Sequence, residues 1–327
     1  SARLRPVMLD EASRSIQLAS FERSAQRNDL SSPPVVDGHA RIHHFSSDEG
    51  PDWPRNPLPN LPACRALGVP ARAELEAVVF QNAGCNWRCW YCFVPFADLT
   101  ARHGDLMPVS KMVDGIEAMR GTTRPLMVDL TGGQPDLVPE WPVWFLEELD
   151  NRGIEDVYVW SDDNLSVDYF WRHLTPTQIA YLGEHPRYGR VGCLKGYDGR
   201  SFAFNTKAKS DLFERQLDLL ARFVRETAID VYLYATFTTP TTEGIGAAME
   251  ALAHRLWDIS PSLLQRVTPL KVAEWGPVTA RLDEQRRRAL ENQFAAIEAW
   301  QESLDKQGVS GRSHDWVTVD DIPALLR

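Results

Sequence analysis

Three of the five cysteines lie within eight residues of one another, which is the strongest chemical signal in the chain. Cys85, Cys89 and Cys92 have the spacing C-x3-C-x2-C and follow a short apolar run. Thiolates are soft ligands that suit iron–sulfur clusters or zinc. A structural zinc site usually takes four protein ligands, and the other cysteines, Cys64 and Cys193, stand far away in the sequence. Three thiolates would leave one iron of a 4Fe–4S cluster open to an outside ligand. The alternatives are a zinc knuckle completed by a distant histidine and three unrelated core cysteines.

The elements that must position this loop are short apolar runs alternating with helical patterns. The runs cover residues 77–80, 126–130, 157–160, 191–194, 231–235 and 267–272, and they predict buried strands. Helices are predicted from Ser110 to near Gly121, from Pro142 to before Gly153, after Ser210, and over residues 283–305. Strands alternating with helices predict an α/β fold of parallel βαβ units. Six such strands fit either a partial barrel or a doubly wound sheet.

The N-terminal part of the chain has a different composition. Eight prolines fall between residues 31 and 70, which makes a regular helix or a central strand improbable there. The same segment holds Ile42, Phe45 and Trp53, which a solvated linker does not need. We therefore expect residues 1–70 to form an extension packed on a core domain of residues 71–305, with a tail over 306–327. A polar helix is expected over residues 7–28.

Composition excludes several classes of protein. The 327 residues include 35 basic and 45 acidic side chains, a formal charge of −10, which disfavours nucleic acid or an anionic membrane as the main partner. No stretch approaches the roughly 18 consecutive apolar residues of a membrane span. The cysteines are too few and too unevenly spaced for a disulfide framework. We expect a cytoplasmic protein with no membrane partner.

The cysteine loop resembles the signature of the radical S-adenosylmethionine (radical SAM) superfamily. In that family, C-x3-C-x2-C follows the first strand of the barrel, and an aromatic residue, here Tyr91, precedes the third cysteine. The resemblance implies a partial (β/α)6 TIM-like barrel with an N-terminal extension and a C-terminal helix. It implies one 4Fe–4S cluster on Cys85, Cys89 and Cys92, with SAM on the open iron. Reductive cleavage of SAM would then give a 5′-deoxyadenosyl radical, with flavodoxin or a ferredoxin-type protein as the electron donor.

A second segment, Thr131-Gly132-Gly133-Gln134-Pro135, follows the second predicted strand. It resembles the family's Gly-Gly-Glu-Pro motif, which implies that Gly132, Gly133 and Gln134 contact the SAM amino group. An amide oxygen accepts a hydrogen bond but carries no charge, so Gln134 would make a weaker contact than the usual glutamate. A simple tight turn also explains two glycines and a proline.

The ends of the later strands supply further candidates. Ser161, Asp162 and Asn164 follow the third strand, where the family places polar contacts to SAM; ordinary loop chemistry is the alternative. Lys195, in Cys193-Leu194-Lys195, resembles the Asp-x-Lys segment of the glycyl-radical-enzyme-activating (pyruvate formate-lyase-activating-like) branch. A lysine there can pair with a carboxylate of SAM or substrate, or lie on the surface. The site lining is expected to include Thr236–Thr239 and Glu274.

The resemblance and the composition together predict an enzyme that takes hydrogen from a small-molecule substrate, either a metabolite or a natural-product intermediate. The acidic charge argues against RNA, and no cysteine follows Cys193, so a second cluster is not expected. One alternative is an activase that installs a glycyl radical on a partner enzyme. Another, motivated by Gln134, is a non-catalytic iron–sulfur or zinc-binding protein.

Overall fold

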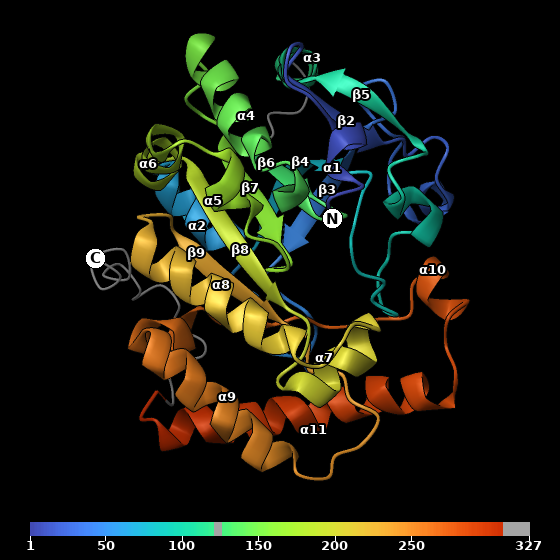
Figure 1. The fold of residues 1–327 in the computed structure, drawn as a ribbon, viewed down its shortest axis with the longest axis vertical. Helices are drawn as coiled ribbons and strands as arrows, with labels where there is room; N and C mark the ends of the chain where they lie inside the picture. Colours follow the sequence, from blue (N-terminus) through green and yellow to red (C-terminus); the bar gives the residue numbers. More distant parts are fainter. Residues whose placement is uncertain (121–125, 310–327) are drawn as a thin grey trace.

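A computed structural model describes residues 1–120 and 126–309, and its main element is a curled sheet of seven strands (Figure 1). The strand order is β10-β9-β8-β7-β6-β4-β3. Neighbours from β4 to β10 are parallel and follow one another in chain order, so the sheet winds in one direction. This is the order of part of a barrel, and the doubly wound alternative is wrong. The parallel strands are β4 (Glu74–Gln81), β6 (Met127–Thr131), β7 (Tyr158–Asp163), β8 (Tyr188–Leu194), β9 (Val231–Ala235) and β10 (Val267–Pro269).

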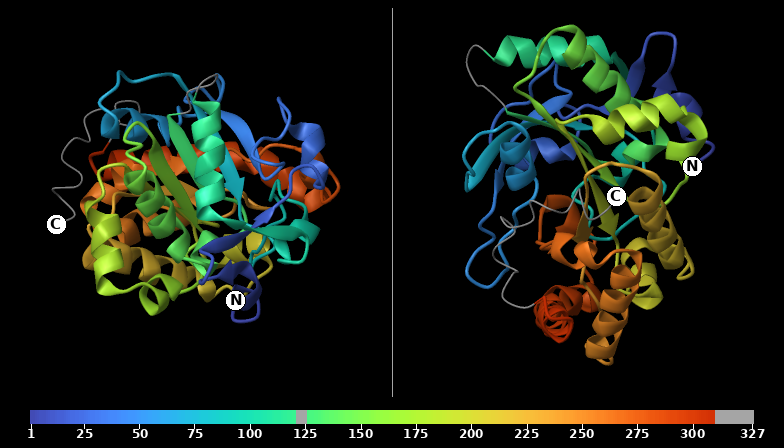
Figure 2. Two further views of the ribbon diagram at one scale, coloured as in Figure 1. Left: turned by 90° about the horizontal axis from the view of Figure 1, so that it is seen from above. Right: turned by 90° about the vertical axis from the view of Figure 1, so that its left-hand side faces the viewer.

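Helices connect the parallel strands, and all four predicted helices are present. The long ones are α3 (Val109–Met119), α4 (Glu140–Asn151), α6 (Pro176–Glu184), α8 (Leu212–Glu226), α9 (Ile245–Ile259) and α11 (Glu284–Lys306). Shorter pieces are α5 (Tyr169–His173), α7 (Gly199–Thr206), α10 (Gly276–Thr279), η2 (Phe96–Leu99), η3 (Pro135–Leu137) and η4 (Pro261–Arg266). Figure 2 shows α9 and α11 packed side by side at one end of the molecule. Among the described helices, none is both long enough and apolar enough to span a bilayer.

The N-terminal residues form strands rather than the predicted helix. The prediction of a helix over 7–28 is wrong, because Ile16 and Leu18 are buried in a strand that pairs with residues 104–108. The expectation that residues 31–70 hold no helix is also wrong: Pro62 lies in the first turn of a short helix, where its missing N–H needs no partner. The elements are α1 (Arg5–Met8), β1 (Leu9–Asp10), β2 (Ser15–Ala19), η1 (Ala25–Asp29), β3 (Ala40–Ser46), α2 (Asn60–Ala66) and β5 (Gly104–Pro108). β1, β2 and β5 form a second sheet, and β3 runs antiparallel to β4 at the edge of the main one.

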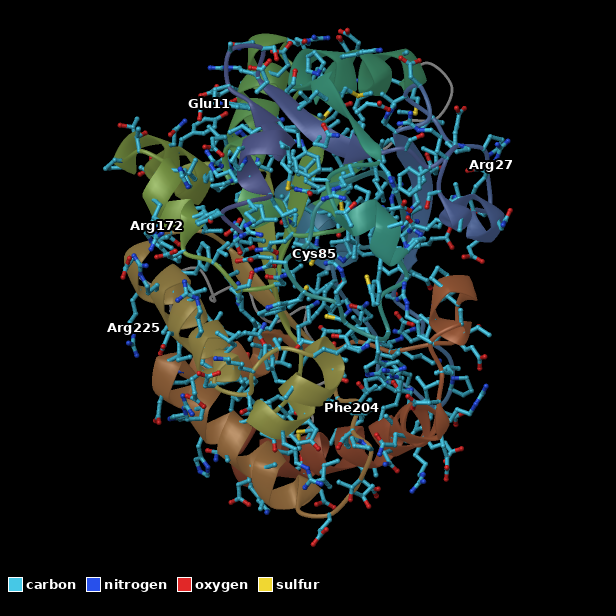
Figure 3. All side chains as sticks on the ribbon, turned by 45° about the vertical axis from the view of Figure 1, so that its right-hand side comes forward. Glu11, Arg27, Cys85, Arg172, Phe204 and Arg225 are labelled. Carbon is cyan, nitrogen blue, oxygen red and sulfur yellow. The ribbon has the colours of Figure 1, made fainter. Side chains whose placement is uncertain are left out.

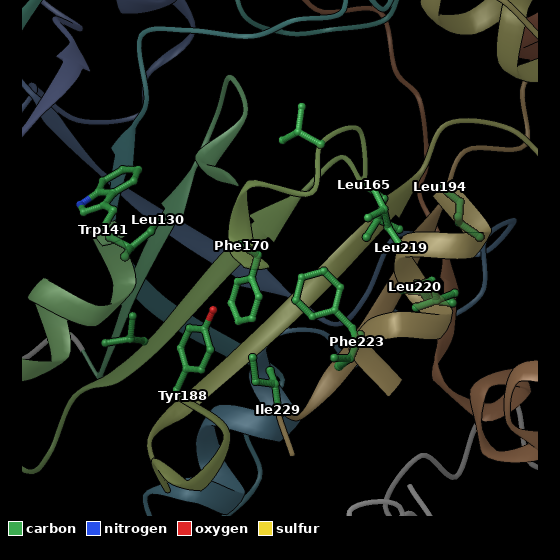
Figure 4. Packing of buried hydrophobic residues seen from close by; sticks show 14 of the residues in the cluster. Leu130, Trp141, Leu165, Phe170, Tyr188, Leu194, Leu219, Leu220, Phe223 and Ile229 are labelled. Carbon is green, nitrogen blue, oxygen red and sulfur yellow. The ribbon is translucent and has the colours of Figure 1, made fainter. Parts of the chain in front are cut away.

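Successive side chains of each strand point to opposite faces of the main sheet. The outer face packs against the helices in one large apolar core, part of which is drawn in Figure 4 around Leu130, Phe170 and Phe223. The inner face carries a second cluster and is covered by α2 and the chain just before it. Within that cover, Trp53 Nε1 donates to the carbonyl of Pro269 at 3.2 Å. The inner-face cluster consists of Leu58, Ala63, Cys64, Leu75, Ala77, Val79, Met127, Tyr158, Trp160, Val191, Cys193, Tyr232 and Tyr234.

The long C-terminal helix α11 departs from prediction at one residue. The 3.6-residue period places Leu290, Phe294, Ile297, Trp300 and Leu304 on one face. Of these, Ile297, Trp300 and Leu304 are buried, but Phe294 is 45% exposed. Its ring packs edge-on against the ring of Trp53, with the two ring centroids 5.7 Å apart. Small and polar residues of the helix are buried instead: Ala289, Gln293, Ala296, Ala299 and Ser303.

Candidate metal centre and cofactor site

The cysteine loop follows β4 at the carboxyl end of the parallel strands. Cys85 and Cys89 are buried and Cys92 is half-buried, and Figure 3 places Cys85 near the centre of the molecule. The backbone N–H of Cys85 donates to the carbonyl of Leu99 at 3.1 Å, which fixes the start of the loop on η2. The three thiols lie close enough to influence one another electrostatically. The structure therefore brings the three predicted ligands together in one buried loop.

Burial opposes ionisation of these thiols, while groups around them favour it. Burial raises the pKa of Cys85 to about 11 and that of Cys89 to about 12. In the opposite direction, the backbone N–H of Trp87 donates to Cys85 Sγ at 3.4 Å, and the positive charges of Lys195 and Arg88 lie near the loop. A metal binds thiolate rather than thiol. N–H donors and cations around the sulfurs are therefore the environment that a metal–thiolate centre needs.

The three thiols of the loop have the donor chemistry of an iron–sulfur cluster. Among the described residues, no group of three or more histidine, cysteine, aspartate and glutamate side chains could hold one metal ion. A zinc site requires donors that converge to about 2.0–2.3 Å from one point. In a 4Fe–4S cluster each thiolate binds a different iron, so the three thiols need only surround a common space. Asn164 adds a second sign of fit, because its Oδ1 is buried without a hydrogen-bond partner while its Nδ2 lies 3.7 Å from Cys85 Sγ.

Two arginines hold the backbone of the loop. Arg281, between α10 and α11, donates from Nη1 to the carbonyl of Cys92 at 2.5 Å and from Nη2 to that of Val94 at 2.9 Å. Arg88 donates from Nη1 to the carbonyls of Cys85 and Trp87, both at 2.7 Å. Arg281 was not predicted from sequence, because nothing in its neighbourhood signals a contact with a loop 189 residues earlier.

Replacing Arg281 should loosen the loop and weaken metal retention. Because Arg281→Gln removes the fork that holds two loop carbonyls, we expect the affinity for the reconstituted metal to fall about 10–100-fold, the usual effect of losing an outer-shell partner. Iron and sulfide per chain, followed during a chelator challenge, measures this. Arg287→Gln is the matched control, since Arg287 is exposed and its nearest acidic partner is Glu274 at 3.9 Å. Equal iron loss from the two variants would contradict the prediction.

The Gly132-Gly133 turn docks directly on the base of the cysteine loop. Both glycines have positive φ, +63° and +55°, which other residues rarely adopt. A Cβ at Gly133 would lie 2.4 Å from the carbonyl oxygen of Gly84 and 2.7 Å from that of Asn82. The N–H of Gln134 donates to the same Gly84 carbonyl at 2.7 Å. The two predicted motifs are therefore in contact through their backbones.

The Gln134 side chain is occupied within the protein. Its Nε2 donates to Asp163 Oδ1 at 2.6 Å, and its Oε1 accepts from the N–H of Asn164 at 2.8 Å. A glutamate could not donate to Asp163 while ionised, so an amide is the side chain that this buried position requires. This gives a local reason for the departure from Gly-Gly-Glu-Pro, and the contact of Gln134 with SAM remains a prediction.

Gln134→Glu should destabilise the fold at neutral pH. The variant places a carboxylate against Asp163 in a buried site, and we expect a loss of about 1–3 kcal/mol in the free energy of unfolding. Burial beside an acid raises the pKa of the new carboxyl in the folded state. The loss of stability should therefore shrink as the pH falls toward the pKa that this carboxyl has in the unfolded chain. Urea unfolding at pH 7 and pH 5 measures both effects. Gln178→Glu, in the exposed capping box of α6, is the control and should change stability little. A loss of equal size at both pH values would count against a buried charge as the cause.

The three predicted residues after β7 lie in different places. Ser161 points to the outer face, where its Oγ lies 2.7 Å from the hydroxyl of Tyr188, so the structure does not bring it to the loop. Asp162 points to the inner face and accepts a hydrogen bond from Thr131 Oγ1. Asn164 lies beside Cys85 and also donates from Nδ2 to Asn86 Oδ1 at 3.2 Å.

Lys195 and Tyr91 lie together beside the cysteines. Burial opposes the charge on Lys195, but Cys193, Tyr91 and Cys89 around it hold its pKa well above the usual value. Burial likewise raises the pKa of Tyr91 well above 10. Among the described residues, no carboxylate lies within 4.0 Å of the Lys195 ammonium. Both predicted residues are therefore near the thiols.

Two buried amides that sequence reasoning missed tie the strand ends together. Gln216 of α8 donates from Nε2 to the carbonyls of Asn164 and Cys193 at 2.7 and 2.8 Å, and its Oε1 accepts from the N–H of Lys195 at 3.1 Å. Asn205 of α7 donates from Nδ2 to the Lys195 carbonyl at 3.0 Å and accepts from Trp90 Nε1 at 3.0 Å. The sequence did contain a sign of the role of Gln216: it is a polar residue on the apolar face of its helix, which indicates a buried side chain that needs hydrogen-bond partners.

The residues predicted to line the site lie in different environments. Thr236 is buried near Tyr91, and Thr238 Oγ1 donates to Asn205 Oδ1 at 2.7 Å, so both belong to the framework of the site. Thr239 Oγ1 donates to the carbonyl of Thr241 at 3.0 Å. Glu274 is exposed and lies 3.9 Å from Nη1 of Arg287.

A surface hollow of about 690 Å³ lies beside α1 and α5. Its walls include Arg5 and His173, but Arg5 already donates to Glu140 Oε2 at 2.9 Å. The hollow contains none of the predicted site residues. We therefore place the site by its chemistry, at the cysteine loop.

Comparison with known proteins gives only distant likenesses. No protein-family model matches the chain, and no curated protein matches it. Streptococcus suis SuiB bound to S-adenosylmethionine is similar at 14% identity and a TM-score of 0.46, over 70% of this chain and 47% of that one. TYW1 with a lysine-pyruvate adduct bound is similar at 12% identity and a TM-score of 0.47, over 86% and 87%. The chain spans less than half the length of SuiB, and likeness of this degree identifies neither family nor activity.

Proposed function

We propose that this chain is a radical SAM enzyme that cleaves S-adenosylmethionine reductively at one 4Fe–4S cluster and takes hydrogen from a small-molecule substrate. The observation that carries the proposal is the joining of two motifs at adjacent strand ends. The C-x3-C-x2-C loop after β4 receives the Gly132-Gly133-Gln134 turn after β6 through the 2.7 Å hydrogen bond from Gln134 to Gly84. A bare turn or an isolated thiol loop would not require this contact.

The residues around the loop have distinct parts in this proposal. Cys85, Cys89 and Cys92 would hold the cluster, which when bound supplies an open iron for SAM and the electron that breaks its sulfonium bond. The Lys195 ammonium, which has no carboxylate partner within 4.0 Å among the described residues, would receive the carboxylate of SAM. The orphan Oδ1 of Asn164 beside Cys85 is an acceptor for the SAM amine. The backbone at Gly132 and Gly133 allows close approach.

Anaerobic reconstitution with iron and sulfide, followed by SAM and dithionite, tests the proposal. We expect 5′-deoxyadenosine and methionine to form, and the electron paramagnetic resonance spectrum of the reduced cluster to change when SAM is added. A fully loaded protein that binds no SAM and forms no 5′-deoxyadenosine would refute it and favour a non-catalytic metal protein. Flavodoxin or a ferredoxin-type protein should replace dithionite as the donor.

The activase function stays as the second candidate because of the Asp-x-Lys resemblance, and the position of Lys195 near the thiols is compatible with it. An activase would leave a protein-bound glycyl radical on a partner enzyme, visible by electron paramagnetic resonance. A small-molecule enzyme would leave none. The same reduced preparation therefore separates the two functions.

A further inference from the structure

The inner face of the main sheet is mostly apolar and aromatic, but three charged residues interrupt it. Strand pairing places Arg41 of β3 beside Val79 of β4, and Val79 beside Asp129 of β6, in one row. Asp162 follows on β7, on the same face. Asp129 interacts electrostatically with both of the others: Asp162 raises its pKa and Arg41 lowers it.

Two of these groups, the buried Asp129 and the half-buried Arg41, lack the partners that such charges normally have, whereas Asp162 accepts a hydrogen bond from Thr131 Oγ1. Asp129 is only 4% exposed, and its Oδ1 accepts no hydrogen bond. The Arg41 side chain makes no hydrogen bond or ion pair to any described residue. On the outer face of the same sheet the pattern is the opposite, because Asp136 and Asp163 lie 2.5 and 2.8 Å from the guanidinium of Arg190. An unpaired buried carboxylate costs several kcal/mol, so Asp129 either holds a proton or pairs with a group outside this chain.

The charge count indicates the sign of that partner. Lys195 also acts electrostatically on Asp162, but the proposed function assigns its charge to the carboxylate of SAM. The two carboxylates and the one guanidinium that remain sum to one negative charge. Burial raises the pKa of Asp129 well above its usual value, with Asp162 adding to the shift and Arg41 opposing it, and burial raises the pKa of Asp162 to about 6. Without a ligand, the pair is therefore held closer to its protonated form. A ligand with one positive charge would take the place of that proton.

We propose that Asp129 and Asp162 together bind a protonated amine of the substrate, and that Arg41 limits the site to a single positive charge. The inference rests on the proposed function, because these residues share a face of the sheet with Lys195, where the reaction would take place. The substrate class is then a small cationic amine. SAM also carries an amine, but Asn164 beside Cys85 is the acceptor available to it near the cluster.

The test uses the reconstituted full chain and small molecules from cell extract, sorted by ion exchange at pH 7 into cationic, neutral and anionic fractions. Each fraction is added with SAM and dithionite, and 5′-deoxyadenosine is measured relative to the same protein without any fraction. We expect the cationic fraction to stimulate the wild type. In Asp129→Asn and Asp162→Asn the amount needed for half-maximal stimulation should rise about 10–100-fold, the worth of one charge-assisted hydrogen bond. Asp114→Asn, at an exposed carboxylate of α3, is the matched control.

A second readout needs no turnover. The melting temperature of the wild type should rise in the cationic fraction, and this rise should be lost in Asp129→Asn; melting without ligand shows whether each variant folds. Stimulation by the neutral or anionic fraction alone, by no fraction, or equally in all variants overturns the proposal. So does an equal rise in the Kd for SAM, since the pair would then bind the SAM amine. Absence of 5′-deoxyadenosine in the wild type under every condition is instead a failure of the proposed function.

Discussion

Replacing Cys85, Cys89 or Cys92 by alanine is expected to abolish stable cluster binding and to reduce 5′-deoxyadenosine formation by at least about 100-fold. The reason is that loss of an outer-shell partner alone costs 10–100-fold, and each thiol is a proposed direct ligand. Iron and sulfide per chain, the absorbance of the reconstituted protein and 5′-deoxyadenosine measured on the same samples check the expectation. All three variants should behave alike, because each thiolate would hold a separate iron.

The two remaining cysteines serve as controls for different points. Cys64 packs under the inner face at 1% exposure, so Cys64→Ala should keep its iron and its activity while losing some stability. Cys193 lies on the inner face near Lys195, and Cys193→Ala asks whether the fourth iron is capped by the protein. If Cys193→Ala loses the cluster as the loop variants do, no corner is open and the radical SAM proposal fails.

The parallel strands were predictable because their chemistry is local. Each is a short run of β-branched and aromatic residues between helices, and all six appear near their expected positions. The start of β8 was placed too late, at Val191, because an arginine inside a buried strand contradicts its usual exposure. Arg190 is nevertheless 1% exposed, since two carboxylates distant in sequence neutralise it. No pattern in the sequence predicts this pairing of Arg190 with two carboxylates.

The N-terminal region was mispredicted for a related reason. Proline content describes residues 31–70 as a whole, but no proline falls within β3 itself, which pairs with β4 along its full length. The polar composition of residues 7–28 suggested a helix, whereas pairing with the distant β5 decides their conformation. Edge strands depend on partners that a single sequence does not name.

The candidate site also contains residues that local sequence indicates and residues that only distant contacts bring there. Residues in short motifs were proposed from the sequence, Cys85 from its spacing to the other cysteines and Gly133 from a resemblance to a family motif. Residues that hold those motifs, such as Arg281 and Gln216, stand on helices and loops far away and were not. Alternation along β7 explains the fate of Ser161 and Asp162: neighbours in a strand face opposite sides, and the prediction included both.

Arg190→Met is expected to lower the free energy of unfolding by about 3–5 kcal/mol at pH 7, because it leaves Asp136 and Asp163 buried without a counter-charge. Arg190 also packs its guanidinium over the ring of Phe223 at 4.2 Å, a contact that methionine keeps in part. Equilibrium urea unfolding, with circular dichroism as the signal, measures the loss. Arg172→Met is the control, since Arg172 is exposed and, among the described residues, its ion pair is with Asp168 on the surface; its loss should stay below about 1 kcal/mol.

The pH dependence of this loss carries the argument further. Burial raises the pKa of Asp136 to about 7 even though Arg190 opposes the shift. The folded state therefore holds a proton that the unfolded chain releases near pH 4, and the contribution of Asp136 to stability declines as the pH rises between those values. Without Arg190 the folded-state pKa rises further, so the decline continues above pH 7, and the loss should be larger at pH 8 than at pH 5. Adding Asp136→Asn and Asp163→Asn to Arg190→Met should restore part of the stability, because it removes the charges as well as their partner. A loss that stays constant from pH 5 to pH 8, and that the added asparagines do not relieve, would assign the role of Arg190 to packing against Phe223 rather than to charge.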